Sequence, residues 1–271
     1  MTKRAKGTLA LILAFVVLAN AGIFWKLSYS KTHTSGDTIV VRVGDTVAAN
    51  HPISQALYIF EEELERISNG RFDVRVYINS ALGGDRQQTE SVILGYMQGN
   101  TPPTSVLAGF DTRFMVVDLP FVFKSGEAAM KTLNGDLGEE LDPILEDLGL
   151  HAVGWTESGY RHITTNNIEA TSPEALKGLS IRTQENPIHM ASFQAWGASP
   201  TPMAFSELFT ALQQGAVDAE ENPLAVITAN RLYEVQNTVT LTGHFYTAGI
   251  FNFNKDFYDS LEGQDKEWFD E

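Results

Sequence analysis

The sequence predicts an α/β fold, and two of its features lead to this prediction. Short β-branched segments alternate along the chain with longer segments whose apolar residues recur at helical spacing. The chain has 271 residues, 43% of them hydrophobic and 20% charged, so it can bury one large core or two modest ones. Cysteine is absent, which excludes disulfides, thiolate metal sites and cysteine nucleophiles.

The first half of the chain is expected to hold two strands and at least two helices. β-branched residues over 38–43 predict the first strand. Apolar residues at helical spacing predict a helix over 52–69, and the glycine that follows is suited to ending it. Strict alternation predicts a second strand over 72–78, and a glycine-containing loop then leads into a helix expected over 85–98.

The second half continues the alternation. One or two helices are expected within 127–148, and buried strands over 150–155 and 161–165. The proline at position 173 favours the first turn of a short helix. The remaining expected elements are strands over 179–182 and 216–218 and helices over 187–196, 206–214 and 223–233.

Charge is distributed unevenly. The formal net charge is -15, yet five of the 19 basic residues lie at or before residue 31, where no acid occurs. The rest of the chain carries 14 basic residues against 34 acids. A body this acidic repels phosphate backbones, so a nucleic acid partner is not expected. A small anionic ligand remains compatible with it, because a local pair of arginines can dominate inside a cleft.

The N-terminus has the layout of a targeting segment. Three basic residues within the first six precede an uncharged, apolar run over 9–25, as in a Sec export signal. Small residues at 19 and 21 offer a cleavage site, but the apolar run continues beyond them, so a cleaved signal peptide and an uncleaved anchor both stay open. Residues 1–36 are assigned to this signal or anchor plus a polar linker. The acidic remainder is expected outside the cytoplasmic membrane, in the periplasm.

The sequence contains none of the common catalytic signatures. Phosphate-binding, dinucleotide-binding and nucleophile-elbow patterns are absent. None of the six histidines lies three or four residues from another, so a local metal cluster is not expected. These observations disfavour an enzyme and predict neither a cofactor nor a metal.

Two arginines are candidate ligand-binding residues. Arg182 ends an apolar strand, and ligands of open α/β sheets gather at the carboxyl ends of strands. Its planar guanidinium can bind a carboxylate through two parallel hydrogen bonds. Arg161 opens the strand expected over 161–165. The alternative for each arginine is an intramolecular salt bridge with one of the many acids, and the alternative for Asn222 is a helix cap only.

Several segments of the chain resemble the DctP-type solute-binding subunits of TRAP transporters, the tripartite ATP-independent periplasmic transporters. The resemblance runs from about residue 38 to the end, in the family's order and spacing. The segments that carry it are LGGDR at 82–86, DLPFVF at 118–123, GYRHIT at 159–164, KGLSIR at 177–182, GASPTPMAFSE at 197–207, ALQQGAVD at 211–218, ENP at 221–223, YEVQ at 233–236 and LTGH at 241–244.

The resemblance implies a two-domain fold like that of periplasmic binding proteins, with a ligand cleft between the domains and strands that cross between them. It assigns residues 37–158, completed by 248–271, to domain I and residues 159–247 to domain II. Relatives continue beyond the end of this chain with a long helix that spans both domains, so the chain is expected to be truncated.

The resemblance also implies roles for individual residues. Arg182 corresponds to the main carboxylate clamp and Arg161 to a second contact. Asn222 and Phe205 correspond to further ligand contacts. Many relatives carry glutamine where this chain has Glu220, which adds an acid near the cleft. The neutral polar residues that could meet ligand hydroxyls are Gln184 and Thr104, both expected at the site, together with Gln98, Thr101 and Asn186.

Together these features predict an exported solute-binding protein that captures a small organic anion and delivers it to the small and large permease subunits of a TRAP transporter. A C4-dicarboxylate or a sugar acid is the favoured ligand. Monocarboxylates, keto acids and ectoine-like zwitterions remain open. Two other classes remain as well: a ligand-sensing binding protein for a signalling receptor, which would use the same cleft, and an exported enzyme.

Overall fold

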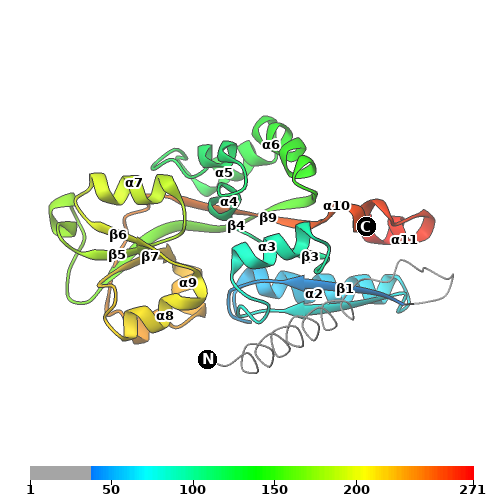
Figure 1. The fold of residues 1–271 in the computed structure, drawn as a ribbon, viewed down its shortest axis with the longest axis horizontal. Coiled ribbons are helices and arrows are strands. Elements are labelled where there is room, and N and C mark those ends of the chain that lie inside the picture. Colours follow the sequence, from blue (N-terminus) through cyan, green and yellow to red (C-terminus); the bar gives the residue numbers. More distant parts are fainter. Residues whose placement is uncertain (1–37) are drawn as a thin grey trace, which may run out of the picture. The chain divides into compact units, whose positions relative to one another are not determined.

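The computed structural model describes residues 38–271, and the predicted export segment and linker lie outside the described residues. Residues 38–271 form one compact unit of alternating strands and helices, which confirms the α/β class (Figure 1). Within this part of the chain, no helix is both long enough and apolar enough to cross a bilayer.

A seven-stranded mixed sheet forms the centre of the molecule. Its strand order is β2-β1-β3-β9-β4-β7, and β8 also pairs with β4. β1 is parallel to both β2 and β3, whereas β9 is antiparallel to β3 and to β4. The strands are β1 (Ile39–Gly44), β2 (Phe72–Tyr77), β3 (Gly99–Asn100), β4 (Leu150–Thr165), β7 (Glu220–Pro223), β8 (Thr238–Thr240) and β9 (Tyr246–Asn254).

The two longest strands run through the molecule along its longest axis. β4 is one strand of 16 residues, whereas the sequence predicted two separate strands in this region. The prediction was wrong because small and polar residues interrupt the apolar pattern, while the backbone pairing with β9 continues through two register shifts, at Ala152/Gly154 and Glu157/Gly159. In Figure 1, β4 and β9 connect the end of the molecule that holds β1 and α2 with the end that holds α7 and α8.

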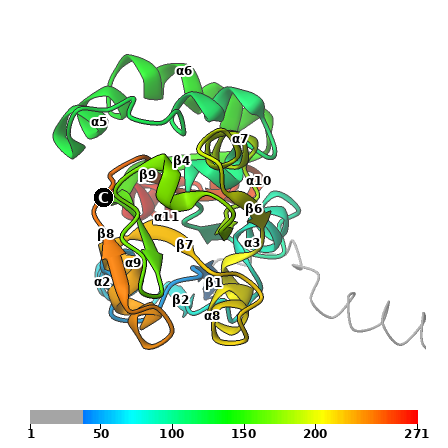
Figure 2. The same cartoon turned by 90° about the vertical axis from the view of Figure 1, so that its left-hand side faces the viewer.

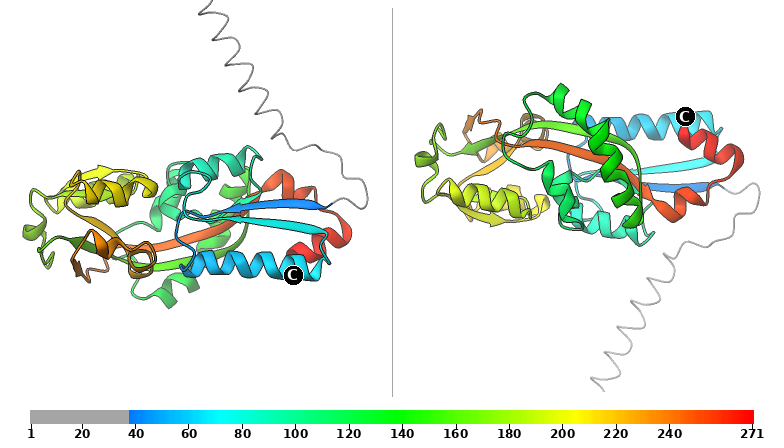
Figure 3. Two further views of the ribbon diagram at one scale, coloured as in Figure 1. Left: turned by 90° about the horizontal axis from the view of Figure 1, so that it is seen from below. Right: turned by 90° about the horizontal axis from the view of Figure 1, so that it is seen from above.

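The early and late helices pack on different strands of the sheet: α2 on β2, α5 and α6 on β4, and α10 on β9. Figure 3 shows α2 lying along β1 and β2. The helix α3 stops at Ile93 instead of residue 98, because Gly95 adopts a positive φ of 76°. The helices and 3-10 turns of this region are α2 (Pro52–Ile67), α3 (Asp85–Ile93), α4 (Thr104–Leu107), η1 (Thr112–Val116), α5 (Gly126–Leu133), α6 (Asp136–Asp147), α10 (Lys255–Asp259) and α11 (Gly263–Asp270).

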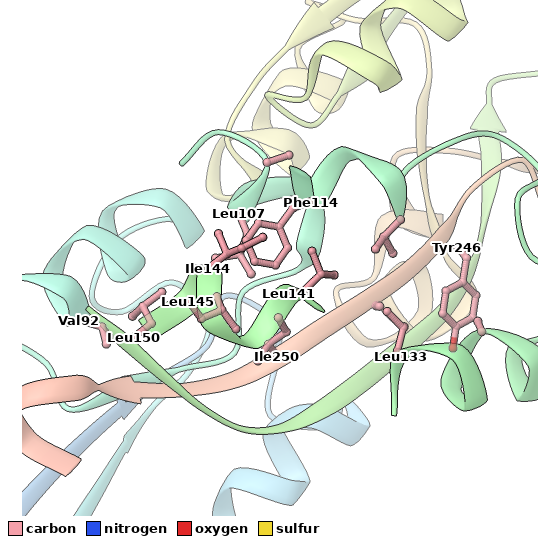
Figure 4. Close-up of a cluster of buried hydrophobic side chains, with 14 of the residues drawn as sticks. Val92, Leu107, Phe114, Leu133, Leu141, Ile144, Leu145, Leu150, Tyr246 and Ile250 are labelled. Atoms are coloured by element: carbon pink, nitrogen blue, oxygen red, sulfur yellow. The ribbon is translucent and has the colours of Figure 1, made fainter. Parts of the chain in front are cut away.

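The largest buried cluster joins α5 and α6 to the two long strands. Leu133 of α5 and Leu141 and Leu145 of α6 lie with Leu150 of β4 and Ile250 of β9 (Figure 4). All of these side chains are at most 3% exposed. Burying leucine-sized side chains stabilises a fold by roughly 1.5–3 kcal/mol each, so this cluster holds β4 and β9 in place beside the candidate site.

The other end of the molecule, which faces the viewer in Figure 2, carries a small parallel sheet and its helices. The strand expected over 216–218 lies instead at 220–223, where pairing with β4 fixes it. The helix expected over 223–233 stops at Ala229, and Arg231 then adopts a positive φ of 57°. The elements here are β5 (Ser180–Thr183), β6 (Ser199–Pro202), η2 (Pro173–Leu176), α7 (Pro187–Ala195), α8 (Phe205–Gln213), α9 (Leu224–Ala229) and η3 (Leu232–Glu234).

Candidate functional site

The candidate site is a cavity that collects residues from both ends of the molecule. One part of its lining follows β1 and β3, and another part comes from β4, β7 and the start of α8. The cavity has a volume of about 50 Å³, which accommodates only a few water molecules. The predicted site residues that line it are Arg161, Gln184, Phe205 and Asn222.

Arg182 lines an adjoining cavity that shares Asp85, Gln184 and Phe205 with the first one. Its Nε and Nη2 atoms donate to the backbone carbonyl of Met203, at 3.0 and 2.7 Å. Its Nη1 atom is buried and has no hydrogen-bond partner within residues 38–271. Burial, assisted by the positive charge of Arg161, lowers the pKa of Arg182 to about 10. The side chain therefore stays charged at neutral pH and keeps one unused donor.

Arg161 is held by Glu221. The two side chains are at most 2% exposed, and the Nη2 atom of Arg161 lies 2.8 Å from Oε1 of Glu221. Nη1 donates to Oγ1 of Thr247 at 3.1 Å. Burial alone would raise the pKa of Glu221, but the guanidinium of Arg161 and a hydrogen bond from His244 hold it well below its usual range. The salt-bridge alternative therefore holds for Arg161.

Strand pairing explains this ion pair. In the antiparallel register of β4 and β7, Arg161 lies opposite Pro223, so the two residues before that proline come beside the guanidinium. Asn222 accepts from Nη2 of Arg161 at 3.2 Å and donates from Nδ2 to Oε2 of Glu220 at 2.6 Å. Asn222 is thus a strand residue in this network, and the cap position of α9 is Pro223.

Phe205 and Gln184 stand between the two cavities. Phe205 is the first residue of α8, and its ring centre lies 6.0 Å from Cζ of Arg182. Gln184 directly follows β5, and its Oε1 accepts from the hydroxyl of Ser105 at 2.7 Å. This bond joins β5 to the chain just after the start of α4. The strand end that carries Arg182 is therefore tied to the first part of the cavity lining.

Thr104 does not line either cavity. It is fully buried at the start of α4, and its hydroxyl lies 3.4 Å from Oδ1 of Asp118 and from the carbonyl of Ala248. The preceding Pro103 bridges to Gly249 and does line the main cavity. This bridge fixes the direction of the chain, so the next residue enters the core. Of the neutral polar residues considered, Gln184 and Thr101 line the main cavity.

Two acids at the site were not singled out from the sequence. Asp45 directly follows β1, and Asp85 opens α3; both line the main cavity. Burial, reinforced by the charge of Asp85, raises the pKa of Asp45 to about 7. Burial also raises the pKa of Asp85. The position of these acids in the sequence could have identified them. Each lies where a strand ends or a helix begins, near the carboxyl end of a strand.

A proton on Glu220 would satisfy the network behind Asn222. The single hydroxyl proton of Thr164 faces two oxygens, Oε1 of Glu220 at 2.7 Å and Oε1 of Gln236 at 3.2 Å. Gln236 donates from Nε2 to the carbonyl of Val235, which leaves its oxygen toward Thr164. Both contacts are satisfied when Glu220 donates to Thr164 and Thr164 donates to Gln236. Burial raises the pKa of Glu220 to about 7, in agreement with this assignment.

Comparison with known proteins identifies the family of the chain. The family model described as DctP, bacterial extracellular solute-binding protein, family 7, matches residues 43–271. The chain belongs to this DctP family of solute-binding proteins. The match includes every element of the candidate site, from the residues after β1 to the strand β9. Its solved relatives named below are TRAP periplasmic solute-binding or sugar-acid-binding proteins, and their two-domain fold is the fold of this chain.

Three relatives illustrate the similarity. The C4-dicarboxylate-binding periplasmic protein DctP of Rhodobacter capsulatus is 35% identical over 226 residues, which are 83% of this chain and 68% of that protein. The sugar-acid-binding protein of Advenella mimigardefordensis, solved with galactonate, superposes with a TM-score of 0.84 at 33% identity, covering 86% of this chain and 76% of that one. A TRAP periplasmic solute-binding protein of Polaromonas, solved with D-erythronate, has a TM-score of 0.82 and 36% identity, with 85% and 76% coverage.

The chain is shorter than its relatives. It spans 62 to 70% of the length of four curated relatives that it matches. The family match nevertheless includes both arginines and the whole lining of the two cavities.

Proposed function

We propose that this protein is the extracytoplasmic solute-binding subunit of a TRAP transporter. It captures a small organic anion, a C4-dicarboxylate or a sugar acid, through an arginine–carboxylate clamp and hands it to the membrane permease subunits. In this proposal residues 37–158 with 248–271 form domain I, residues 159–247 form domain II, and the protein acts in the periplasm.

The observation that carries the proposal is the state of Arg182. A buried, charged guanidinium with an unsatisfied Nη1 is costly, because the charge has lost its hydration and its hydrogen bonds within the described residues all go to one backbone carbonyl. No carboxylate of residues 38–271 forms an ion pair with it, so an incoming carboxylate is the partner that satisfies it. Arg161 differs, since Glu221 already neutralises it; its role in the proposal is to add a second donor.

The small size of the cavity supports a hinge step. A volume of about 50 Å³ is too small for an acid of four or more carbons and its water. The two parts of the lining must therefore move apart for entry and close again on the ligand. Contacts from the ligand to both parts favour the closed form, so binding shifts this equilibrium. A permease that recognises the closed form would then receive loaded protein selectively.

A thermal-shift screen of the full-length protein tests the proposal. Organic acids that bind only the folded state raise the Tm, by an amount set by the ratio of concentration to Kd. The screen should include succinate, malate, galactonate, D-erythronate, pyruvate and a zwitterion. We expect at least one hydroxylated or dicarboxylic acid to raise the Tm of the wild type and to leave that of Arg182→Met unchanged. No shift with any acid at millimolar concentration would contradict the proposal.

A further inference from the structure

A groove of about 380 Å³ lies where the two proposed domains meet. We call it the rim groove; its lining comes from within 46–48 and 79–80 on the domain I side and from within 205–209 and 229–232 on the domain II side. Thr46 and Phe205 line both the rim groove and the main cavity, so the groove adjoins the candidate site. Figure 1 shows α8 and α9 beside the loop that joins β1 to α2.

A hydrogen bond joins the two sides of the rim groove. The backbone nitrogen of Ala48 donates to Oδ1 of Asn230 at 3.1 Å, between residues 182 positions apart in the sequence. Both residues are half-buried. Neither lines the main cavity or the cavity beside Arg182. The bond therefore holds the proposed domains together without contacting a molecule bound in either cavity.

The side chain of Asn230 is oriented by its own helix. Asn230 ends α9, and its Nδ2 donates to the carbonyl of Val226 at 2.9 Å. Oδ1 is therefore the atom that faces Ala48. A flipped amide would place two donors against each other at Ala48 and two acceptors at Val226, so the two bonds together fix the orientation of the amide.

The loop that carries Ala48 is held by the turn that follows β2. The backbone nitrogen of Asn79 donates to the carbonyl of Val47 at 2.9 Å, and that of Ser80 donates to the carbonyl of Asp45 at 3.3 Å. These bonds tie the loop to the neighbouring strand, so the N–H of Ala48 moves with domain I as a whole.

Backbone strain gathers at the rim groove. Three of the six non-glycine residues with positive φ in the described part of the chain line it: Asn79 and Ser80, both at 56°, and Arg231 at 57°. Left-handed backbone is unfavourable for a residue with a side chain, and it persists where the structure around it imposes it, as at ligand clamps and switch segments. The strained residues flank the bond on both sides, since Arg231 directly follows Asn230.

Asn230 differs from the other side chains that link the proposed domains. Gln184 accepts from the hydroxyl of Ser105 at 2.7 Å, but it also lines both cavities. Asn186 donates to the carbonyl of Ser105 at 3.1 Å and to Oδ2 of Asp118 at 2.8 Å, but it is fully buried. Asn230 alone of these three combines a bond between the domains with access to water and a place outside both cavities.

We propose that Asn230 is a latch for the closed form: its Oδ1 binds the N–H of Ala48 when the domains close on a ligand and exchanges it for water when they open. This inference rests on the proposed function, because it assumes that the domains close. Both partners are half-buried, so water replaces the bond at a small net cost and the latch is reversible. The latch slows release of the ligand, and it acts equally on every acid because it contacts none of them.

The rate of ligand release tests the latch. Stopped-flow fluorescence of the full chain gives kon and koff for succinate, galactonate, D-erythronate and any other acid that raises the Tm. Asn230→Ala should raise koff about 3- to 10-fold, as expected for one half-exposed hydrogen bond, and leave kon within about twofold. The rise should be the same for each acid. Asn230→Asp keeps an acceptor for Ala48, so its koff should stay within about twofold of the wild type.

Asn134→Ala is the matched control. Asn134 ends α5 as Asn230 ends α9, and its Nδ2 likewise donates to the carbonyl four residues before it, that of Met130, at 2.9 Å. It is exposed and lines neither the rim groove nor the two cavities. Its replacement removes the same kind of helix-ending side chain, so koff should not change.

The outcomes separate the latch from the proposed function. An unchanged koff in folded Asn230→Ala, or an equal rise in Asn134→Ala, overturns the latch while the binding function stands. A rise that differs more than threefold between acids also overturns it, because Asn230 would then be a ligand contact. Failure of every acid to bind the wild type overturns the proposed function and the latch together. Thermal melts establish that each variant is folded.

Discussion

The guanidinium carbon of Arg182 lies 6.0 Å from the centre of the Phe205 ring, and Phe205 lines both the main cavity and the one beside Arg182. A cation over an aromatic face is stabilised by the ring's negative π face. The ring also excludes water from one side of a charge that already lacks a full set of partners. Phe205 therefore contacts the charge of Arg182 without occupying its free Nη1 donor.

Phe205→Ala should weaken ligand binding. It removes both the cation–π contact and the apolar cover, so we expect a loss of about 1–2 kcal/mol, or roughly 5- to 30-fold in Kd. Phe205→Tyr retains an aromatic face and should stay within about threefold of the wild type. Calorimetric titration with the tightest ligand of the screen measures both. Equal affinities for Phe205→Ala and the wild type would show that the ring has no part in binding.

Glu221→Gln should destabilise the protein strongly. It leaves the buried guanidinium of Arg161 without its counter-charge, and breaking a buried pair in this way costs about 3–5 kcal/mol. Chemical denaturation measures the free energy of unfolding. The control is Glu63→Gln on the exposed face of α2, where the pair with Arg66 is solvated and its loss should change the free energy of unfolding far less. If Glu221→Gln is as stable as the control, Arg161 does not depend on this pair.

Glu220→Gln should change how stability depends on pH. The folded pKa of Glu220 is about 7, raised by burial, whereas an unfolded glutamate has a pKa of about 4.3. The folded state therefore binds more protons between these values, so this contribution to stability is complete below about pH 4.3 and is lost as pH rises through 7. Relative to Glu220→Gln, the wild type should lose about 3 kcal/mol between pH 4.5 and 8.

The comparison of the wild type with Glu220→Gln isolates the contribution of Glu220 to the pH dependence of stability. The charged neighbours that act on it are Glu221 on the same strand and Arg161 on β4, and both are unchanged in the variant. Asp45 and Asp118 also have pKa values raised by burial to about 7, but they titrate in both proteins and cancel in the difference. Unfolding free energies measured at several pH values give that difference. A constant difference would mean that Glu220 carries no proton in this range.

Local patterns predicted much of this structure. β-branched runs and helical spacing located β1, α2, β2, β5 and α7 to within a few residues. Position near the end of β5 made Arg182 a candidate, because the carboxyl end of a buried strand is visible in the sequence itself. The same reasoning would have identified Asp45, which directly follows β1.

The remaining site features depend on contacts that the sequence does not display. The ion pair between Arg161 and Glu221 joins residues 60 positions apart, and only the register of β4 against β7 brings them together. The unbroken length of β4 depends on its pairing with β9. The burial of Thr104 depends on the bridge between Pro103 and Gly249. In each case long-range pairing overrode the local pattern.

The most direct test of the carboxylate clamp is the Kd of the tightest-binding acid for Arg182→Lys and Arg182→Met, measured by calorimetry against the wild type. Arg113→Met is the matched control, since Arg113 pairs with Asp111 at the surface and lines neither cavity. Losing a buried charge partner should cost about 3 kcal/mol or more, which is over 100-fold in Kd. Arg182→Lys should also bind poorly, because an ammonium cannot form two parallel bonds to a carboxylate. Folded Arg182 variants that bind the acid within threefold of the wild type would contradict the clamp.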